Sequence, residues 1–355
     1  MLRVICLSLS WLIALSAIAQ PNPANQKHDP KDALGWFERA SEQLNLRALG
    51  SAPFHMKVSF HAFPGVELLP AKEKSEFAIG DGIYEETWLS PQQWRREVTL
   101  GSYHAVETHS DRVRKMQASS EYEPSRVIML IEALLNPIAH YVLSPDLRVR
   151  HFNWKMDRST VGDHTLMRIS ASKGISSHIN EGSAYVFLSG GLLVQSNEND
   201  IVTTFQDDVV FAGRVVPRHI SIQAGAVRDL LTADVVVERA GDVDPSVFEL
   251  PGEPAEAGMT LRPLTWYADK FPEIIKASGI ISQQETYPDM IMHGIVDRHG
   301  AMREFEVIYM QGIVGATAMD TPGRLVEAAR QYKFHPAEID GSPCESTYGV
   351  FQTRH

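Results

Sequence analysis

Hydrophobic and polar residues alternate along much of the chain, which is typical of strands whose two faces meet different surroundings. In His55 to Phe63, the residues Met56, Val58, Phe60 and Ala62 share one face. Similar segments follow, separated by glycine and proline turns. They are Ile83–Trp88, Trp94–Leu100, Tyr103–Thr108, Val149–Lys155, Thr165–Ser170, Ala184–Ser189, Val209–Val216, His219–Gln223 and Leu231–Val237. Because parallel strands need long crossovers, the short connections predict an antiparallel sheet.

Two segments have the periodicity of helices instead. Lys31 to Leu46 places Leu34, Phe37, Ala40 and Leu44 on one stripe. Ser125 to Leu135 is apolar on one side and is ended by Asn136-Pro137. Helices packed against the concave face of a large curved sheet would bury both stripes. The predicted fold class is therefore α+β, with a half-barrel-like antiparallel domain over residues 32–250.

A second, smaller domain is predicted at residues 285–355. Proline and glycine interrupt the pattern in residues 251–284, which predicts a linker with a weak helix from Leu261 to Ile281. Beyond it, Met290–Val296 and Ala301–Tyr309 are predicted to form a hairpin. A helix from Thr321 to Tyr332 and a last strand, Ser346–Gln352, complete a β-β-α-β pattern.

The first 19 residues have the features of a secretory signal peptide. Arg3 precedes an apolar run from Val4 to Leu15, and Ala17 and Ala19 are small residues at the expected cleavage site. The run is shorter than the ~20 residues of a membrane-spanning helix. We expect export to the periplasm and no transmembrane segment in the mature chain. An uncleaved inner-membrane anchor is the alternative.

Composition and motifs narrow the function classes. The chain has 355 residues, with 44 acidic against 33 basic ones, and this acidity argues against a nucleic-acid partner. Of its two cysteines, Cys6 lies in the leader, which leaves Cys344 without an internal disulfide partner. The 14 histidines form no metal-binding motif, and no nucleophile motif is present. We therefore expect no metal, no cofactor and no enzymatic activity.

Several residues near the C-terminus form a recognisable pattern. Gly294, Asp297 and Gly300 lie at the first hairpin, and Tyr332, Phe334, Pro336, Gly341 and Pro343 follow the predicted helix. In this pattern, residues 285–352 resemble the TonB C-terminal domain. The resemblance implies that a small sheet binds an extended segment of an outer-membrane receptor or another envelope protein by strand addition. The implied binding edge is the last strand, with Ser346, Thr347, Tyr348, Val350 and Gln352.

The first domain is similar in architecture to the lipoprotein-carrier (LolA-like) half-barrel. The likeness consists of an opening helix, a long meander that includes Glu85 to Pro91, an inserted helix and a closing Val247 to Pro251. It implies an apolar concavity that holds acyl chains. Two functions stay open: a periplasmic, non-enzymatic protein that binds a partner by strand addition, with a role in outer-membrane transport, or a carrier for a lipid or lipoprotein acyl chain.

Overall fold

The structure is a computed structural model, and it describes the residues in thirteen ranges. These are 29–65, 78–110, 113–120, 123–135, 137–138, 153–172, 184–198, 201–225, 228–251, 273–276, 289–311, 331–339 and 341–352. The predicted leader cleavage site at Ala17 and Ala19 and nearly all of the predicted helix 321–332 lie outside these residues. Most of the predicted linker 251–284 also lies outside the described residues, so its boundaries stay a prediction.

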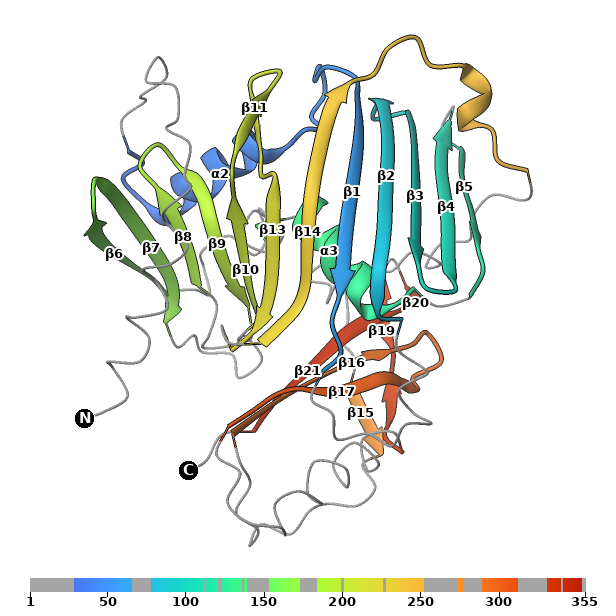
Figure 1. The fold of residues 1–355 in the computed structure, drawn as a ribbon. Coiled ribbons are helices and arrows are strands. Elements are labelled where there is room, and N and C mark those ends of the chain that lie inside the picture. Colours follow the sequence, from blue (N-terminus) through green and yellow to red (C-terminus); the bar gives the residue numbers. More distant parts are fainter. Residues whose placement is uncertain are drawn as a thin grey trace, which may run out of the picture. The chain divides into compact units, whose positions relative to one another are not determined.

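A large antiparallel sheet dominates the described chain (Figure 1). Its order is β5-β4-β3-β2-β1-β14-β13-β10-β9-β8-β7-β6, and it is open, with β5 and β6 at its ends. Strands β3 to β5 and the series from β6 to β14 pair antiparallel with their neighbours. The members are β1 (Phe54–Ala62), β2 (Gly80–Ser90), β3 (Gln93–Leu100), β4 (Tyr103–Ser110), β5 (Val113–Ala118), β6 (Asn153–Val161), β7 (His164–Ser172), β8 (Ala184–Leu188), β9 (Leu192–Glu198), β10 (Ile201–Gln206), β13 (His219–Ala224) and β14 (Arg228–Arg239).

Smaller elements complete the described structure. The helices are α2 (Ala33–Leu44), α3 (Ser125–Leu135) and the 3₁₀ turn η5 (Pro245–Phe248), and a separate hairpin consists of β11 (Val209–Phe211) and β12 (Arg214–Val216). The C-terminal strands are β15 (Glu273–Lys276), β16 (Asp289–Val296), β17 (Met302–Gln311), β18 (Lys333–His335), β19 (Ala337–Ile339), β20 (Ser342–Cys344) and β21 (Ser346–Gln352). The α+β fold class with a large antiparallel sheet and two α-helices is confirmed.

Contacts divide the chain into two compact units. Unit 1 comprises Met1–Phe60, Glu85–Pro91 and Ala133–Val243, and unit 2 comprises His61–Tyr84, Gln92–Glu132 and Asp244–His355. Each unit is described by itself below.

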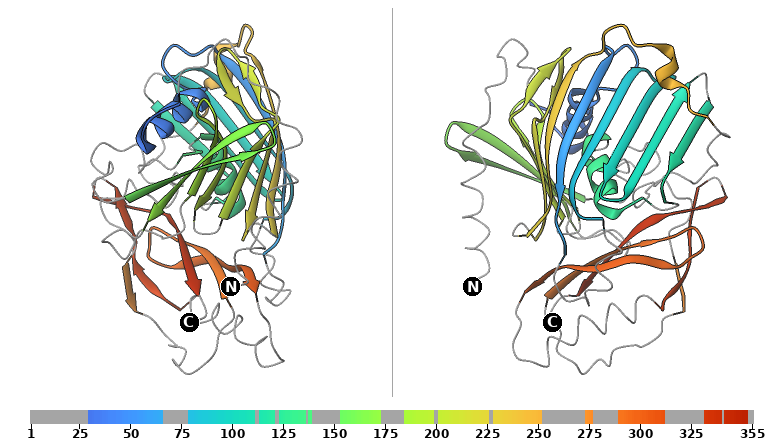
Figure 2. Two further views of the ribbon diagram at one scale, coloured as in Figure 1. Left: turned by 90° about the vertical axis from the view of Figure 1, so that its left-hand side faces the viewer. Right: turned by 45° about the vertical axis from the view of Figure 1, so that its right-hand side comes forward.

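The core of unit 1 forms where α2 packs on the sheet (Figure 2). Phe37 lies edge-on to Tyr185 and Trp154, with ring centres 5.0 and 5.1 Å away, and its centre lies 5.7 Å from that of Phe187. The ring centres of Trp36 and Phe187 are 5.7 Å apart, and Trp36 is 1% exposed. Such aromatic pairs add directional attraction to the burial of large apolar surfaces. This cluster fixes α2 against β6 and β8.

The strand β1 confirms the alternation that the sequence predicts. Phe54, Met56, Val58, Phe60 and Ala62 are buried, while the residues between them are partly or fully exposed. Both predicted helices are confirmed as α2 and α3. The predicted stripe of α2 is only partly right, because Phe37 and Ala40 are buried while Leu34 and Leu44 are half-buried.

Some predicted boundaries are wrong. The strand expected at 149–155 is β6, which runs to Val161, because the Thr165 to Ser170 strand continues its pairing through a tight turn at Gly162. Strands β5, β9 and β10 were not expected, because their polar residues hide the alternation. The strand expected from Ile83 begins earlier, since β2 starts at Gly80 although glycine is typical of turns.

Two more expectations need correction. The predicted strand 209–216 is a hairpin, because Ala212 and Gly213 both have positive φ and reverse the chain. Within the weak helix expected at 261–281, residues 273–276 form β15, which pairs with β18. Short strands of this kind depend on a partner that is distant in sequence, which a local pattern does not reveal.

Replacing Phe37 with alanine is expected to lower the free energy of unfolding by about 3–5 kcal/mol, because the substitution leaves a cavity among buried rings. Phe37→Leu keeps much of the volume and serves as the matched control, with a smaller loss. Urea unfolding of both variants measures the difference. An unchanged midpoint for Phe37→Ala would show that α2 does not depend on this cluster.

Candidate functional site

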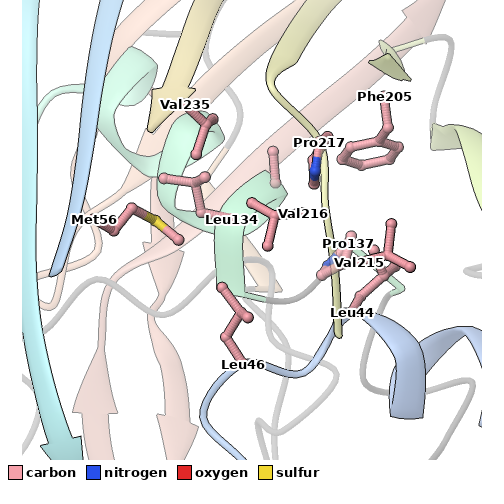
Figure 3. Close-up of a pocket in the computed structure, with 11 residues that line it drawn as sticks. Leu44, Leu46, Met56, Leu134, Pro137, Phe205, Val215, Val216, Pro217 and Val235 are labelled. Carbon is pink, nitrogen blue, oxygen red and sulfur yellow. The ribbon is translucent and has the colours of Figure 1, made fainter. Parts of the chain in front are cut away.

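An apolar pocket lies within unit 1, between the ends of two helices and the sheet. Figure 3 shows 11 lining residues, whose side chains converge from several segments. Every one of them is apolar. They are Leu44, Leu46, Met56, Ala133, Leu134, Pro137, Phe205, Val215, Val216, Pro217 and Val235. The pocket therefore offers no charge or hydrogen-bonding side chain and suits an apolar group.

Three short segments and three strands of the large sheet build this lining. The end of α2 supplies Leu44, the last turn of α3 supplies Leu134, and the second strand of the β11–β12 hairpin supplies Val216. The sheet adds Met56 from β1, Phe205 from β10 and Val235 from β14. Each of these elements turns apolar residues toward the pocket, so the pocket follows from the amphipathic patterns of the sequence.

The pocket is narrow. The cavity among the lining side chains gives the centre of a water molecule about 20 Å³, which is room for about one water. A ligand with a long apolar chain therefore enters only when part of the wall moves.

A buried ion pair stands next to the pocket. Arg47 follows the lining residue Leu46, and its Nε donates to Glu86 Oε1 at 2.8 Å. Its Nη1 donates to the carbonyl oxygen of Leu134 at 3.4 Å, and its guanidinium lies 5.6 Å from the centre of the Phe54 ring. Glu86 is 1% exposed, and a buried carboxylate needs such a partner. The pair ties two segments of the wall together.

The base of the β11–β12 hairpin carries a half-buried carboxylate, that of Asp208. Burial raises the pKa of Asp208 to about 6, and the adjacent Asp207 carboxylate adds to the rise. Asp208 Oδ1 is buried and has no hydrogen-bond partner in the structure as described. The charged form of Asp208 is therefore unfavourable in the folded protein.

The predicted binding edge lies in unit 2. The C-terminal sheet has the order β17-β16-β21, so β21 stands at its edge in the described chain. Ser346, Thr347, Tyr348, Val350 and Gln352 all belong to β21, and each pairs in register with β16 on its other side. One side of β21 is therefore the edge of this sheet, and strand addition takes place at such an edge.

The motif residues of the C-terminal module have structural roles. Asp297 Oδ1 accepts hydrogen bonds from the amides of His299 and Ala301, at 2.8 and 2.9 Å, and closes the hairpin between β16 and β17. Gly300 has φ of +76°, and a Cβ there would collide with the carbonyl oxygen of Phe334. Only glycine fits both constraints.

The remaining motif residues lie at turns and close contacts around Phe334, whose side chain is 2% exposed. A Cβ at Gly294 would lie 2.7 Å from the ring of Phe305, so glycine permits that close packing. The Tyr332 ring lies 6.3 Å from that of Phe334, and Pro336 separates β18 from β19. Gly341, with φ of +72°, turns β19 into β20, which contains Pro343.

Unit 2 also buries charged side chains between α3 and β17. Arg126 Nη1 lies 2.5 Å from Glu306 Oε1, and both side chains are almost fully buried. Arg126 Nε donates to the carbonyl oxygen of Phe63 at 3.0 Å. His293 is buried nearby, and burial, with the Arg126 charge, lowers its pKa to about 3. We therefore expect His293 to be neutral at physiological pH.

A second group of charges holds the start of α3. The amide of Ser125 donates to Glu304 Oε2 at 2.8 Å, and Arg303 Nη1 donates to Glu304 Oε1 at 2.9 Å. Arg303 Nη2 donates to Glu345 Oε2 at 3.0 Å. These pairs stabilise the packing of unit 2, although Glu345 Oε1 is buried without a hydrogen-bond partner among the described residues.

Histidines and cysteine do not gather into a reactive site. His61 pairs with Asp81 and His104 with Glu97 on exposed strand positions, at 2.7 and 2.9 Å. Cys344 is 1% exposed in β20. Among the described residues, no group of three histidine, cysteine or carboxylate side chains has the arrangement of a metal site.

Sequence reasoning missed the residues that line the pocket. It placed Met56 on an apolar strand face and Leu44 on a helical stripe but did not bring them together. The strongest missed signal is Val215-Val216-Pro217, three apolar residues directly after the Ala212-Gly213 turn. The two tryptophans Trp88 and Trp94 do not line the pocket, and Trp88 stacks on Phe54 with a ring-centre distance of 5.6 Å.

The comparisons with known proteins found similar solved structures. No protein-family model and no curated protein matches the chain. It is similar to the crystal structure of a LolA superfamily protein from Nitrosomonas europaea, at 8% identity and a TM-score of 0.31, over 60% of this chain and 97% of that one. It is also similar to a DUF1329 family protein from Desulfovibrio piger, at 6% identity and a TM-score of 0.37, over 63% of this chain and 98% of that one.

Both TM-scores lie below 0.5, so neither likeness supports a statement about function. The TonB C-terminal resemblance of residues 285–352 stays a prediction. No helix in the described part of the chain is long and apolar enough to span a membrane.

The stability of the protein is expected to depend on the ionisation of Asp208. Because its folded pKa is raised to about 6, the folded state binds this proton more tightly than the unfolded chain. Wild type should therefore lose stability relative to Asp208→Asn as pH rises from 4 to 7. We expect a relative loss of about 1–2 kcal/mol, after allowing for partial exposure.

Urea unfolding of both proteins at pH 4, 5, 6 and 7 measures this difference. Asp207→Asn removes the adjacent charge that adds to the raised pKa of Asp208, so its stability should depend less on pH than that of wild type. A constant difference between wild type and Asp208→Asn over this range would contradict the burial of a charged Asp208.

Proposed function

We propose that the protein is an exported, non-enzymatic carrier of the periplasm that binds the acyl chain of a lipid or lipoprotein in the pocket of unit 1. The observation that carries this proposal is the pocket's lining, which consists of 11 apolar residues. A carrier needs such a site because acyl chains are insoluble in water. The signal-peptide features of residues 1–19 support the compartment.

The energetics favour an acyl chain over a compact polar ligand. Each methylene group that leaves water for apolar surroundings contributes about 0.8 kcal/mol. A polar ligand would lose its hydrogen bonds to water without gaining any from the lining side chains. The head group of a bound lipid would therefore remain outside the pocket, and recognition would rest on the chain.

Filling the pocket should abolish binding. Val215→Trp places a large side chain at a half-buried lining position and is expected to weaken the binding of a fluorescent fatty acid at least tenfold. Val210→Trp is the matched control, because Val210 belongs to the same hairpin but is 69% exposed. A fluorescence titration of wild type and both variants measures the effect.

Two outcomes would contradict the carrier function. Wild type that binds no fatty acid, phospholipid or acylated peptide would overturn it. Equal affinities of wild type and Val215→Trp would show that acyl chains bind elsewhere. Circular dichroism and the unfolding midpoint confirm that each variant is folded.

A second function, strand addition to an envelope protein, is favoured by the sequence of β21. Four strands end the two larger sheets of the described structure, namely β5, β6, β17 and β21. The first three carry charged residues, which protect edges from pairing, whereas Ser346–Gln352 has none. An uncharged edge suits a partner strand, and an outer-membrane receptor segment is the partner that we propose.

Photo-cross-linking from the edge strand tests this second function. A photoreactive residue at Thr347 or at the next position of β21, Tyr348, is expected to give an adduct with an envelope protein in intact cells. The same residue at Lys155 in the charged edge strand β6 is the control and should give none. Absence of an adduct at both β21 positions would contradict strand addition.

A further inference from the structure

The β11–β12 hairpin is an excursion from the large sheet. Strands β10 and β13 pair with each other up to Gln206 and His219, and the chain between these residues forms the hairpin. Strands β11 and β12 pair only with each other in the sheet order of the described chain. The hairpin is therefore joined to the ladder of the large sheet only at its base, by residues 207–208 and 217–218.

One side of this hairpin closes the pocket. Val215, Val216 and Pro217 line it, and Phe205 lines it from β10 just before the base. At the other strand of the hairpin, Val210 is 69% exposed. Removal of the hairpin from this position would thus expose three lining residues and widen the pocket.

The contacts that hold the hairpin tip are modest. Arg214 Nη1 donates to the carbonyl oxygen of Glu42 in α2. The Phe211 ring lies edge-on to Phe54, with ring centres 6.4 Å apart. The Arg214 hydrogen bond is exposed and contributes little to stability, whereas Phe54 is fully buried. In β12, Val216 is 2% exposed and Val215 packs against the cluster of Leu166, Val186, Leu188 and Leu192, so opening has to separate these apolar contacts.

The base of the hairpin has the features of a strained hinge. Asp207 has φ of +56°, which is unfavourable for a residue with a side chain. Asp208 buries a carboxylate oxygen that has no hydrogen-bond partner among the residues described. A movement at this base would relax the backbone of Asp207 and hydrate Asp208, so both features lower the cost of opening.

We propose that hairpin β11–β12 is the gate of the pocket: it swings at residues 207–208 and 217–218 to admit an acyl chain and then closes over it. This inference rests on the proposed carrier function. It also explains how a pocket with room for about one water serves an acyl chain, because the moving wall supplies the missing space.

Cross-linking the gate to α2 tests the proposal. Glu42→Cys and Arg214→Cys place thiols on the two sides of an existing contact, and a short bismaleimide joins them. The control is the same double variant treated with N-ethylmaleimide, which modifies both thiols without joining them. Cys344 is buried and is left in place.

The readout is the rate at which a fluorescent fatty acid enters the full-length protein in stopped flow. We expect entry to be at least tenfold slower in the cross-linked protein than in the control. Equal rates with binding intact would overturn the gate while leaving the carrier function standing. Failure of wild type to bind the probe would instead overturn the carrier function.

A spin-label measurement checks the movement without restraining it. Nitroxides at Val210→Cys and Glu238→Cys report the distance from the hairpin to β14, and the pair Ser59→Cys and Glu238→Cys reports the sheet alone. Addition of palmitate is expected to shift or broaden the first distance distribution and to leave the second unchanged. An unchanged first distribution in protein that binds palmitate would contradict the gate.

Discussion

The packing of Phe37 against the rings of Trp154, Tyr185 and Phe187 is the interaction on which unit 1 depends. It fixes α2 to the sheet, and the end of α2 delivers Leu44 and then Leu46 to the pocket. Without these ring contacts, α2 would have no fixed position against the strands. The pocket is thus a consequence of a well-packed aromatic cluster that lies outside its lining.

Charges in unit 1 are kept out of the pocket lining but stay close to it. Arg47 and Glu86 form a buried pair beside the pocket, and Asp208 lies at the foot of its movable wall. Breaking a buried pair is costly, whereas an unpartnered carboxylate favours a state in which water reaches it. The Arg47–Glu86 pair therefore makes its wall of the pocket rigid. The unpartnered carboxylate of Asp208 makes the wall formed by the hairpin easy to move.

The sequence allowed much of the fold to be predicted, because alternation in segments such as β1 is strong and local. It failed where polar residues hide the pattern, as in β9 and β10, and where glycine suggests a turn inside a strand, as at Gly80. The C-terminal hairpin was predicted from Asp297 and Gly300, whose roles are set by backbone geometry.

The candidate sites differ in how far sequence could find them. The edge strand β21 was predicted because one short segment defines it. The pocket was expected only as a concavity, since its lining joins residues as far apart as Leu44 and Val235. No local pattern records that Leu134, Val216 and Met56 meet. Only the packing of α2 and the hairpin on the sheet brings them together.

The most direct test of the carrier function is methyl NMR of the full-length protein with a spin-labelled fatty acid. The account predicts that the nitroxide selectively broadens the methyl resonances of Leu44, Leu134, Val215 and Val216. In the Val215→Trp variant, whose pocket is filled, the methyl resonances of Leu44, Leu134 and Val216 should remain sharp. Equal broadening in wild type and in this variant, or no broadening in wild type, would contradict an acyl chain in the pocket.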